Sequence, residues 1–195
     1  TAAERYEKLL AMKDTLPEWI TIVEKTVVKS KDEIMREYLK FMGTGYEGSM
    51  IQDVNGTYKN GKSTAIEGKL LKVKETVDAE CKIIGFNNMF LNNNEETEDE
   101  FGHTTRSSNM ENLESLDMLG SLVCETLKSE HFEEGIVFKI GSGFSMSQRE
   151  AIWSMREEFL GKLVTYKFLP HGIKDAPRCP IFKGFRDKDD MDSQK

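Results

Sequence analysis

The sequence is poor in the residue types that build disulfide-linked or metal-stapled folds. Its 195 residues include three cysteines, Cys81, Cys124 and Cys179, which stand far apart and form no Cys-x-x-Cys pair. The three histidines show no His-x-x-x-His spacing either. These absences give no support to a disulfide framework, a zinc knuckle or another transition-metal site built by the protein alone. We expect the cysteines to be free, buried thiols.

Long apolar stretches are also lacking. No window approaches the roughly 18 consecutive apolar residues that a membrane-spanning helix needs. The first residues, Thr1 to Arg5, are mostly polar, whereas a signal peptide begins with a charged region followed by an apolar one. We therefore expect a cytoplasmic protein with no membrane partner. With four prolines and 38% apolar residues, the composition is that of a globular chain of one domain or two small ones.

Charge is abundant but unevenly spread. The chain has 27 basic and 34 acidic residues, a net charge of -7, which on average argues against a polyanionic partner. Locally the balance reverses, because 55–74 holds five lysines against one acid and 162–188 holds seven basic residues against two acids. The acids gather in 95–100 and in the tail 187–192, which we expect to be solvated loops. Either basic stretch is also compatible with an ordinary solvated face.

The first 75 residues mix helical and strand patterns. Apolar spacing predicts a short helix near 4–13, and the run of β-branched residues at 19–28 predicts a strand. Ser30 and Glu33 form a capping box, in which both side chains satisfy amides at the start of a helix, so a second helix is expected over 31–42. Two further strands are expected at 46–52 and 69–74, separated by turn-rich segments.

The remaining chain is dominated by strand patterns, expected at 79–91, 117–127, 134–139, 162–168 and 181–185. A single helix interrupts them, beginning at a capping box Ser147-Gln148-Arg149-Glu150 and ending at Gly161. Five strands with one helix fit a partly open barrel of the OB type, with a generic antiparallel sheet as the alternative. The predicted fold class is therefore α+β, with domains 1–75 and 76–188 and an acidic tail 189–195.

Lys72 and Lys74 are the first candidates for chemistry. Side chains two apart on a strand share a face, so both ammonium groups point the same way while Leu71 and Val73 can pack on the other side. Such a pair suits an anion lying between the two ammonium groups. It is equally tolerated on a solvated edge strand, where lysines discourage aggregation.

Glu47 is the second candidate, because it is a carboxylate within an otherwise apolar strand and is followed by a glycine that permits close approach. A buried acid needs a partner, which is either Mg²⁺ or a structural lysine. The nearby segment GTYKNGKS, from Gly56 to Ser63, has the spacing of a phosphate-binding P-loop. A lysine-rich strand follows it in place of the helix that a P-loop requires, so we interpret this match as a coincidence.

Three blocks in this order resemble the motifs of ATP-dependent DNA ligases, which belong to the covalent nucleotidyltransferase superfamily. They are Glu47-Gly48, the Lys-x-Lys block at Lys72 and Lys74, and an Arg-x-Pro-x-Phe-x-x-x-Arg block from Arg178 to Arg186. The resemblance covers nearly the whole chain. It departs from the family at the end, where Asp187-Lys188 follows Arg186 directly although the family has one residue between the arginine and this pair.

The resemblance implies ATP and Mg²⁺ as cofactors and nicked duplex DNA as the partner of a monomeric enzyme in a bacterial or phage-infected cell. Glu47 would help to hold the metal, and Lys72 and Lys74 would contact the α-phosphate of AMP. Arg178, Arg186 and Lys188, on a mobile OB domain, would orient the departing pyrophosphate. The residues expected to contact DNA are lysines of the two basic stretches, namely Lys59, Lys62, Lys162 and Lys167.

The nucleophile motif of this family, Lys-x-Asp-Gly, occurs nowhere in the 195 residues. We therefore expect the chain to represent the end of an adenylation domain followed by an OB domain, to be inactive alone, and to act with the missing N-terminal portion. RNA ligases and capping enzymes are the alternative within the superfamily. A non-catalytic single-strand binder is another, if aromatic side chains prove exposed on one barrel face (Phe86, Phe138, Trp153, Phe159 and Phe168).

Overall fold

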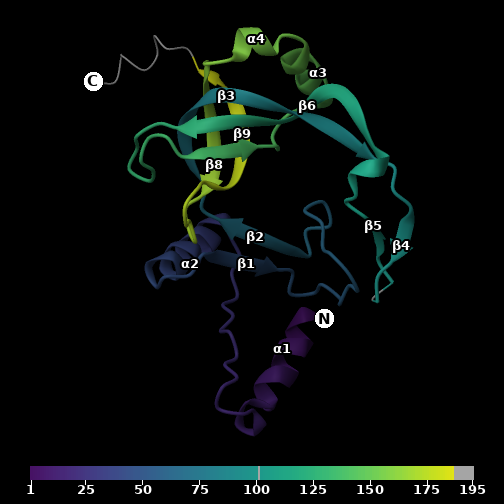
Figure 1. The fold of residues 1–195 in the computed structure, drawn as a ribbon. Coiled ribbons are helices and arrows are strands. Elements are labelled where there is room, and N and C mark those ends of the chain that lie inside the picture. The colour runs from purple at the N-terminus through teal and green to yellow at the C-terminus, as the bar shows by residue number, and fades with distance from the viewer. Residues whose placement is uncertain (101, 187–195) are drawn as a thin grey trace. The chain divides into compact units, whose positions relative to one another are not determined.

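The computed structural model describes residues 1–100 and 102–186. The chain divides into two compact units, Thr1–Glu75 and Thr76–Lys195, which we name unit 1 and unit 2 (Figure 1). The predictions that concern Asp187, Lys188 and the tail 189–195 lie outside the described residues. Within the described part of the chain, no helix is long and apolar enough to cross a membrane.

Unit 1 contains two helices and a two-stranded sheet. Helix α1 (Ala2–Ala11) starts at a capping box between Thr1 and Glu4, and a short 3-10 turn, η1 (Lys13–Thr15), follows it. Helix α2 (Lys31–Gly43) begins as predicted at Ser30, whose hydroxyl accepts a hydrogen bond from the backbone N–H of Glu33. Strands β1 (Gly48–Gln52) and β2 (Leu70–Lys74) pair antiparallel.

The strand predicted at 19–28 is wrong. Trp19 lies in a turn, residues 20–28 have no regular secondary structure and belong to no sheet, and Trp19, Val23 and Val27 are 83%, 71% and 71% exposed. β-branched residues favour a strand only where a neighbouring strand offers hydrogen bonds and a packing surface. Neither α1 nor the β1–β2 hairpin provides one for this segment.

Unit 2 is an OB-type barrel, as the strand pattern predicted. Its five strands, β3 (Val77–Asn92), β6 (Leu113–Thr126), β7 (Val137–Ile140), β8 (Leu163–Leu169) and β9 (Arg178–Arg186), are ordered β7-β6-β3-β8-β9. A parallel bridge between Ser142 and Ile181 brings the two edges together and closes the barrel. The predicted α+β class with an OB domain is therefore confirmed.

The barrel interior is a continuous apolar core. Ile83, Leu122, Val164 and Tyr166 are fully buried in it. Phe138 and Phe168 are buried, and Phe86, Trp153 and Phe159 pack against the same cluster. The aromatic side chains thus serve mainly as packing, which removes the main support for a base-stacking binder.

The helical segment between β7 and β8 consists of α3 (Met146–Ser154) and α4 (Arg156–Phe159). Its cap lies two residues earlier than predicted. Ser145 and Gln148 form the capping box, because the Ser145 hydroxyl accepts from the Gln148 N–H and the Gln148 side chain accepts from the Ser145 N–H. With the helix beginning at this position, Arg149 donates hydrogen bonds to the carbonyls of Leu119, Gly120 and Gly141.

An arm extends from the barrel where β3 and β6 continue as a two-stranded ribbon (Figure 1). Its end carries a short hairpin, β4 (Glu96–Glu98) and β5 (Thr104–Arg106), and a 3-10 turn, η2 (Met110–Asn112). The acidic run 95–100, predicted as a loop, therefore includes a strand. Asn94 is 5% exposed and anchors the hairpin through its side-chain amide, which donates to the carbonyls of Ser107 and Asn109.

Candidate functional site in unit 1

The β1–β2 hairpin brings Glu47 and Lys74 together. Glu47 immediately precedes β1, and Gly48 lies opposite Lys74 in the antiparallel register. The Lys74 ammonium donates to the Glu47 carboxylate at a distance of 2.6 Å from Nζ to Oε1. The sequence left two partners open for Glu47, Mg²⁺ or a structural lysine. In the structure, Glu47 is paired with Lys74.

Gly48 is required by this close approach. A Cβ atom at this position would lie 2.2 Å from the backbone carbonyl oxygen of Val73, far inside the van der Waals limit. Only a residue without a side chain allows β1 to approach β2 at this point. The Glu-Gly pair therefore has a structural basis. Gly48 permits the close approach of β1 to β2, and this approach places the Glu47 carboxylate beside Lys74.

Lys72 and Lys74 share one face of the hairpin, as predicted. Both side chains are exposed, whereas Leu71 and Val73, which alternate with them, are half-buried on the opposite side. Met50 lies opposite Lys72 in the register and is 52% exposed on the same face. We call this surface, formed by Met50, Gln52, Lys72 and Lys74, the hairpin face.

Lys25 adds a third cation beside the hairpin face. Its ammonium donates to the Gln52 side-chain oxygen at 2.8 Å and lies 5.0 Å from the centre of the Tyr6 ring. The sequence pattern did not single out this residue, because its position depends on a segment with no regular secondary structure. The result is three ammonium groups along one hairpin, of which Lys74 is paired with a carboxylate.

The side chains around Glu47 provide few of the oxygen ligands that Mg²⁺ needs. Among residues 1–100 and 102–186, no group of three or more His, Cys, Asp or Glu side chains could hold a metal ion. Mg²⁺ is usually held by one or two carboxylates together with substrate phosphates and waters. Glu47 can supply one such oxygen ligand, but the described residues do not form a complete metal cage.

The other lysines of this stretch have different surroundings. Lys59 forms an ion pair with Glu67 at 2.7 Å, and the Lys59 ammonium, with the Thr64 N–H, lowers the pKa of Glu67 from 4.5 to about 2. Lys62 is exposed. Residues 56–63 are followed by a turn, so the surroundings differ from those of a P-loop, as expected.

Arg178 and Arg186 lie at opposite ends of β9, about 26 Å apart for an extended strand. Arg178 donates to the backbone carbonyl of His171 at 2.7 Å. The Nε atom of Arg186 lies 2.9 Å from Oε1 of Glu80. The structure thus does not bring these two arginines together within unit 2.

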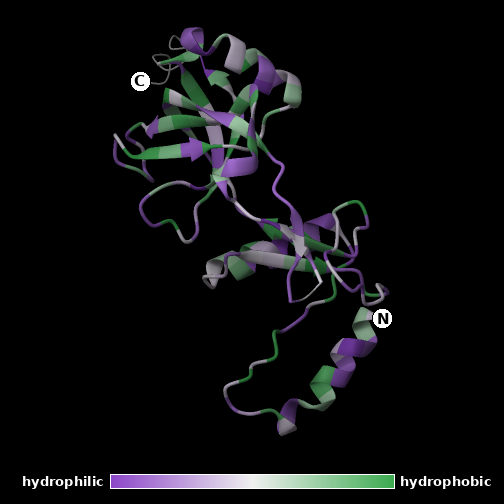
Figure 2. Cartoon of the chain, turned by 45° about the vertical axis from the view of Figure 1, so that its right-hand side comes forward, coloured by the Kyte–Doolittle hydropathy of each residue, from purple (hydrophilic) through white to green (hydrophobic). Residues whose placement is uncertain are grey.

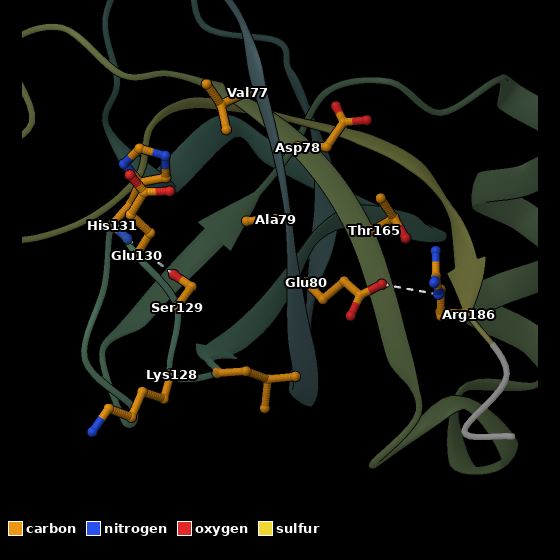
Figure 3. A pocket seen from close by; sticks show the side chains of 11 residues that line it. Val77, Asp78, Ala79, Glu80, Lys128, Ser129, Glu130, His131, Thr165 and Arg186 are labelled. Atoms are coloured by element: carbon orange, nitrogen blue, oxygen red, sulfur yellow. Dashed lines mark hydrogen bonds and ion pairs between the residues drawn. The ribbon is translucent and has the colours of Figure 1, made fainter. Parts of the chain in front are cut away.

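Arg186 borders a concavity of about 450 Å³ in unit 2 (Figure 3). Its lining includes Glu80 and Asp78 from β3, Thr165 from β8 and the loop residues Ser129 and His131. The ion pair between Glu80 and Arg186 was missed from the sequence. It depends on β3 and β9 flanking β8, an order that no local pattern contains.

The two lysines predicted on the barrel also differ. Lys162 is exposed, and its ammonium lies 4.8 Å from the centre of the Phe159 ring. Lys167 is half-buried on β8, opposite Asp78 and Ile181 in the registers of the neighbouring strands.

Comparison with known proteins assigns both units. Residues 1–74 match the family described as the ATP dependent DNA ligase domain, and residues 115–186 match the DNA ligase OB-like domain. The DNA ligase of Haemophilus influenzae is 26% identical over 187 residues, covering 94% of this chain and 55% of that protein. The DNA ligase of enterobacteria phage T4 is 32% identical over 66 residues, 34% of this chain and 13% of that one.

A solved structure gives the same result. A DNA ligase of the Lig E type, studied for DNA binding with a minimal scaffold, superposes with a TM-score of 0.63 at 26% identity. The superposition covers 94% of this chain and 58% of that chain.

The fold and the matched ranges define the chain as an ATP-dependent DNA ligase domain joined to a DNA ligase OB-like domain. More specifically, the chain corresponds to two consecutive domains of an ATP-dependent DNA ligase. It spans about half the length of the Haemophilus influenzae relative, with 55% of that protein covered.

Proposed function

We propose that this chain supplies the C-terminal part of an ATP-dependent DNA ligase that seals nicks in duplex DNA. In this reaction a lysine forms lysyl-AMP, the AMP passes to the 5′-phosphate of the nick, and the 3′-hydroxyl then displaces the AMP. The observation that carries the proposal is the hairpin face, where Lys72 and Lys74 point the same way and Glu47 holds Lys74.

The chemistry of this face suits a phosphate that gains charge during transfer. Two ammonium groups on one side of a strand offer charge-assisted hydrogen bonds to the α-phosphate oxygens. Donors that are fixed in advance stabilise such charge in the transition state. The Glu47 carboxylate forms an ion pair with the Lys74 ammonium, and it would supply one oxygen ligand to Mg²⁺. When bound, Mg²⁺ would neutralise phosphate charge.

The remaining site residues are assigned by the same proposal. Arg178, Arg186 and Lys188 would orient pyrophosphate, and for Arg186 this requires release of the ion pair with Glu80. Lys162 and Lys167 would contact the DNA backbone, together with Lys59 and Lys62. Of these four lysines, Lys59 has the strongest competing partner, since Glu67 pairs with it.

The first test uses the chain alone with radiolabelled ATP and Mg²⁺. Because Lys-x-Asp-Gly is absent from the sequence, no label should remain on the denatured protein. Label that survives denaturation would mean that another residue of this chain is the nucleophile, and it would contradict the proposal.

The second test measures binding to nicked duplex DNA as the salt concentration rises. Affinity should fall steeply, because each neutralised phosphate contributes about -0.9 to the slope of log K against log[salt]. The double substitution Lys162→Ala and Lys167→Ala should make this slope shallower by about 2, whereas Lys8→Ala on the exposed side of α1 should leave it unchanged. Affinity independent of salt would exclude the proposed DNA contacts.

A further inference from the structure

The arm joins the barrel at an interruption of the β3–β6 ladder. Between Asn87 and Met89 the register of β3 against β6 shifts twice, so that residues 117, 118 and 120 of β6 are left out of the pairing with β3. Extra residues of this kind form β-bulges, which bend a strand and disrupt the ladder locally. A Cβ atom at Gly120 would collide with the backbone carbonyl of Asn88, so the two strands approach very closely here. The junction between the barrel and the arm therefore has the structure of a hinge.

The apolar core of unit 2 does not extend into the arm. Figure 2 shows hydrophobic segments along the strands of the barrel, and the core reaches as far as Phe86 on β3 and Leu119 on β6. Among the described residues, none between 88 and 118 belongs to the core cluster or packs against it. Core packing therefore does not fix the angle at which the arm leaves the barrel.

Arg149, on α3, provides a contact that can fix this angle. Its guanidinium donates to the carbonyls of Leu119 and Gly120 at 2.7 and 2.9 Å, and to the carbonyl of Gly141 at 2.6 Å. Gly141 follows β7 directly, so this side chain connects the bulged part of β6 to the end of the neighbouring strand. The Cζ atom of Arg149 lies 5.3 Å from the centre of the Phe144 ring. Hydrogen bonds from a charged donor are stronger than neutral ones, and the planar guanidinium holds its acceptors in fixed directions.

The arm itself is held together by its own contacts and is strongly acidic. The Arg106 guanidinium donates to the Asn94 carbonyl and pairs with Glu96, which connects the two strands of the terminal hairpin. A rotation would therefore occur at the junction and move the arm as one body. Residues 93–117 contain eight acidic residues against one basic residue, a net charge of -7, which equals the net charge of the whole chain.

We propose that Arg149 locks this hinge and holds the acidic arm at a fixed angle to the barrel. An arm released from the lock would swing, and its carboxylates would come within reach of the lysines of the barrel. Exposed charges interact over about 10 Å at 0.1 M salt, so carboxylates within that range compete with phosphates for these lysines. The lock thus keeps Lys162 and Lys167 available to DNA, a consequence that rests on the proposed function.

The first experiment measures the distance between two nitroxide labels on the full chain. Thr104→Cys places one label on β5 of the arm, and Val137→Cys places the other on β7 of the barrel, where the side chain is 60% exposed. Cys179→Ser removes the exposed native thiol, and the other two cysteines are completely buried. Pulsed electron paramagnetic resonance should give a narrow distance distribution, which Arg149→Met should broaden at least about twofold.

A second variant and a matched control complete this experiment. Arg149→Lys keeps the charge and the aliphatic stem but loses the planar fork, so it should also broaden the distribution. Arg156→Met should leave the distribution narrow, because Arg156 donates to the carbonyl of Trp153, three residues earlier. Circular dichroism and amide exchange of β8 would show which variants retain the barrel. Equal widths in the unsubstituted chain and in whichever Arg149 variant retains the barrel would overturn the lock, as would a broad distribution in the unsubstituted chain.

The second experiment separates the lock from the proposed function. At low salt, Arg149→Met should weaken binding of nicked duplex DNA by about threefold or more, because the released arm competes for the lysines. Neutralising three exposed acids of the arm in the same variant, by Glu95→Gln, Glu98→Gln and Glu111→Gln, should restore the affinity. Unchanged affinity together with a broadened distance distribution would support the lock and contradict the competition between arm and DNA. Absence of DNA binding by the unsubstituted chain would contradict the proposed function, whereas the distance distributions would still decide the lock.

Discussion

The two units of this chain differ in how much apolar surface they bury. Unit 2 closes five strands around a continuous core in which Tyr166 and Phe168 are almost completely buried. Unit 1 holds a two-stranded hairpin and two helices with a single buried apolar side chain, Ala2, among the described residues. An isolated two-stranded hairpin is marginally stable in water. Unit 2 therefore has an apolar core of its own, whereas unit 1 buries little apolar surface.

Glu47, Lys72 and Lys74, the candidate residues for phosphate and metal binding, lie in the unit with almost no buried apolar side chains. Glu47, Lys72 and Lys74 are fixed by local features, namely the close approach at Gly48 and one ion pair, and not by a core. A site with few buried contacts needs little free energy to rearrange.

The largest contrast is expected from truncation of apolar side chains. Phe168 is 1% exposed and packs against the rings of Phe132 and His131, so Phe168→Ala should lower the free energy of unfolding by about 3–5 kcal/mol. Leu39 is 61% exposed on α2, and Leu39→Ala should change stability by less than about 0.5 kcal/mol. Urea unfolding followed by circular dichroism would measure both. Similar losses in the two variants would contradict the difference between the units.

A buried polar network supplies the next largest effect. The Thr126 hydroxyl donates to the Glu133 carbonyl at 2.6 Å and accepts from the Ile136 N–H at 3.0 Å. Thr126→Val keeps the shape but leaves both backbone groups without this partner, so unit 2 should lose about 1–3 kcal/mol. Thermal unfolding compared with Thr126→Ser, which retains the hydroxyl, would separate the hydrogen bonds from the methyl group. An unchanged Thr126→Val protein would show that water replaces both bonds.

The glycine before β1 tests the hairpin in unit 1. Gly48→Ala places a Cβ against the Val73 carbonyl, which should cost about 1–3 kcal/mol and open the β1–β2 register. Gly43→Ala, at the end of α2 with no atom within 4 Å of the added Cβ, is the matched control. Nuclear Overhauser effects between Met50 and Lys72 should disappear in the first variant and persist in the second. Persistence in both would mean that the strands tolerate a side chain at position 48.

The smallest effect concerns pH. The pKa of Glu67 is lowered to about 2, so the contribution of its pair with Lys59 is present above the unfolded pKa of 4.5 and is lost as pH falls through about 2. Because the pair is exposed, the effect on stability should be small. Lys59→Ala should return the pKa of Glu67 towards 4.5, as a carbon-13 titration of its carboxylate would show. A pKa that stays near 2 would assign the shift to the Thr64 N–H alone.

Local patterns predicted much of the fold. The cap at Ser30 and the alternation in the barrel strands gave helix α2 and the OB architecture, because these elements depend on short-range rules. The strand predicted at 19–28 does not form, because no neighbouring strand pairs with it. The acidic run 95–100 was predicted as a loop from its charge, whereas β4 within it pairs with the nearby strand β5. The capping box at Ser145 was missed because Ser147 and Glu150 have the same capping-box spacing.

The candidate site could likewise be predicted only in part. The shared face of Lys72 and Lys74 follows from the two-residue period of a strand. A lysine was one of the two partners expected for Glu47, but its identity as Lys74 depends on strand register. The pair Glu80–Arg186 could not be predicted, because it depends on strand order. Arg178 and Arg186 belong to one sequence motif, and the motif alone does not indicate that they lie at opposite ends of β9.

The most direct test is single-turnover sealing of a nick by the chain mixed with the part of the Haemophilus influenzae ligase that lies outside the aligned region. Substitution of Lys72 or Lys74 by alanine should slow sealing by about 100-fold or more. The control Lys8→Ala should seal at the rate of the unsubstituted protein. Rates within threefold of that protein for both hairpin variants would contradict a role for this face in phosphate chemistry.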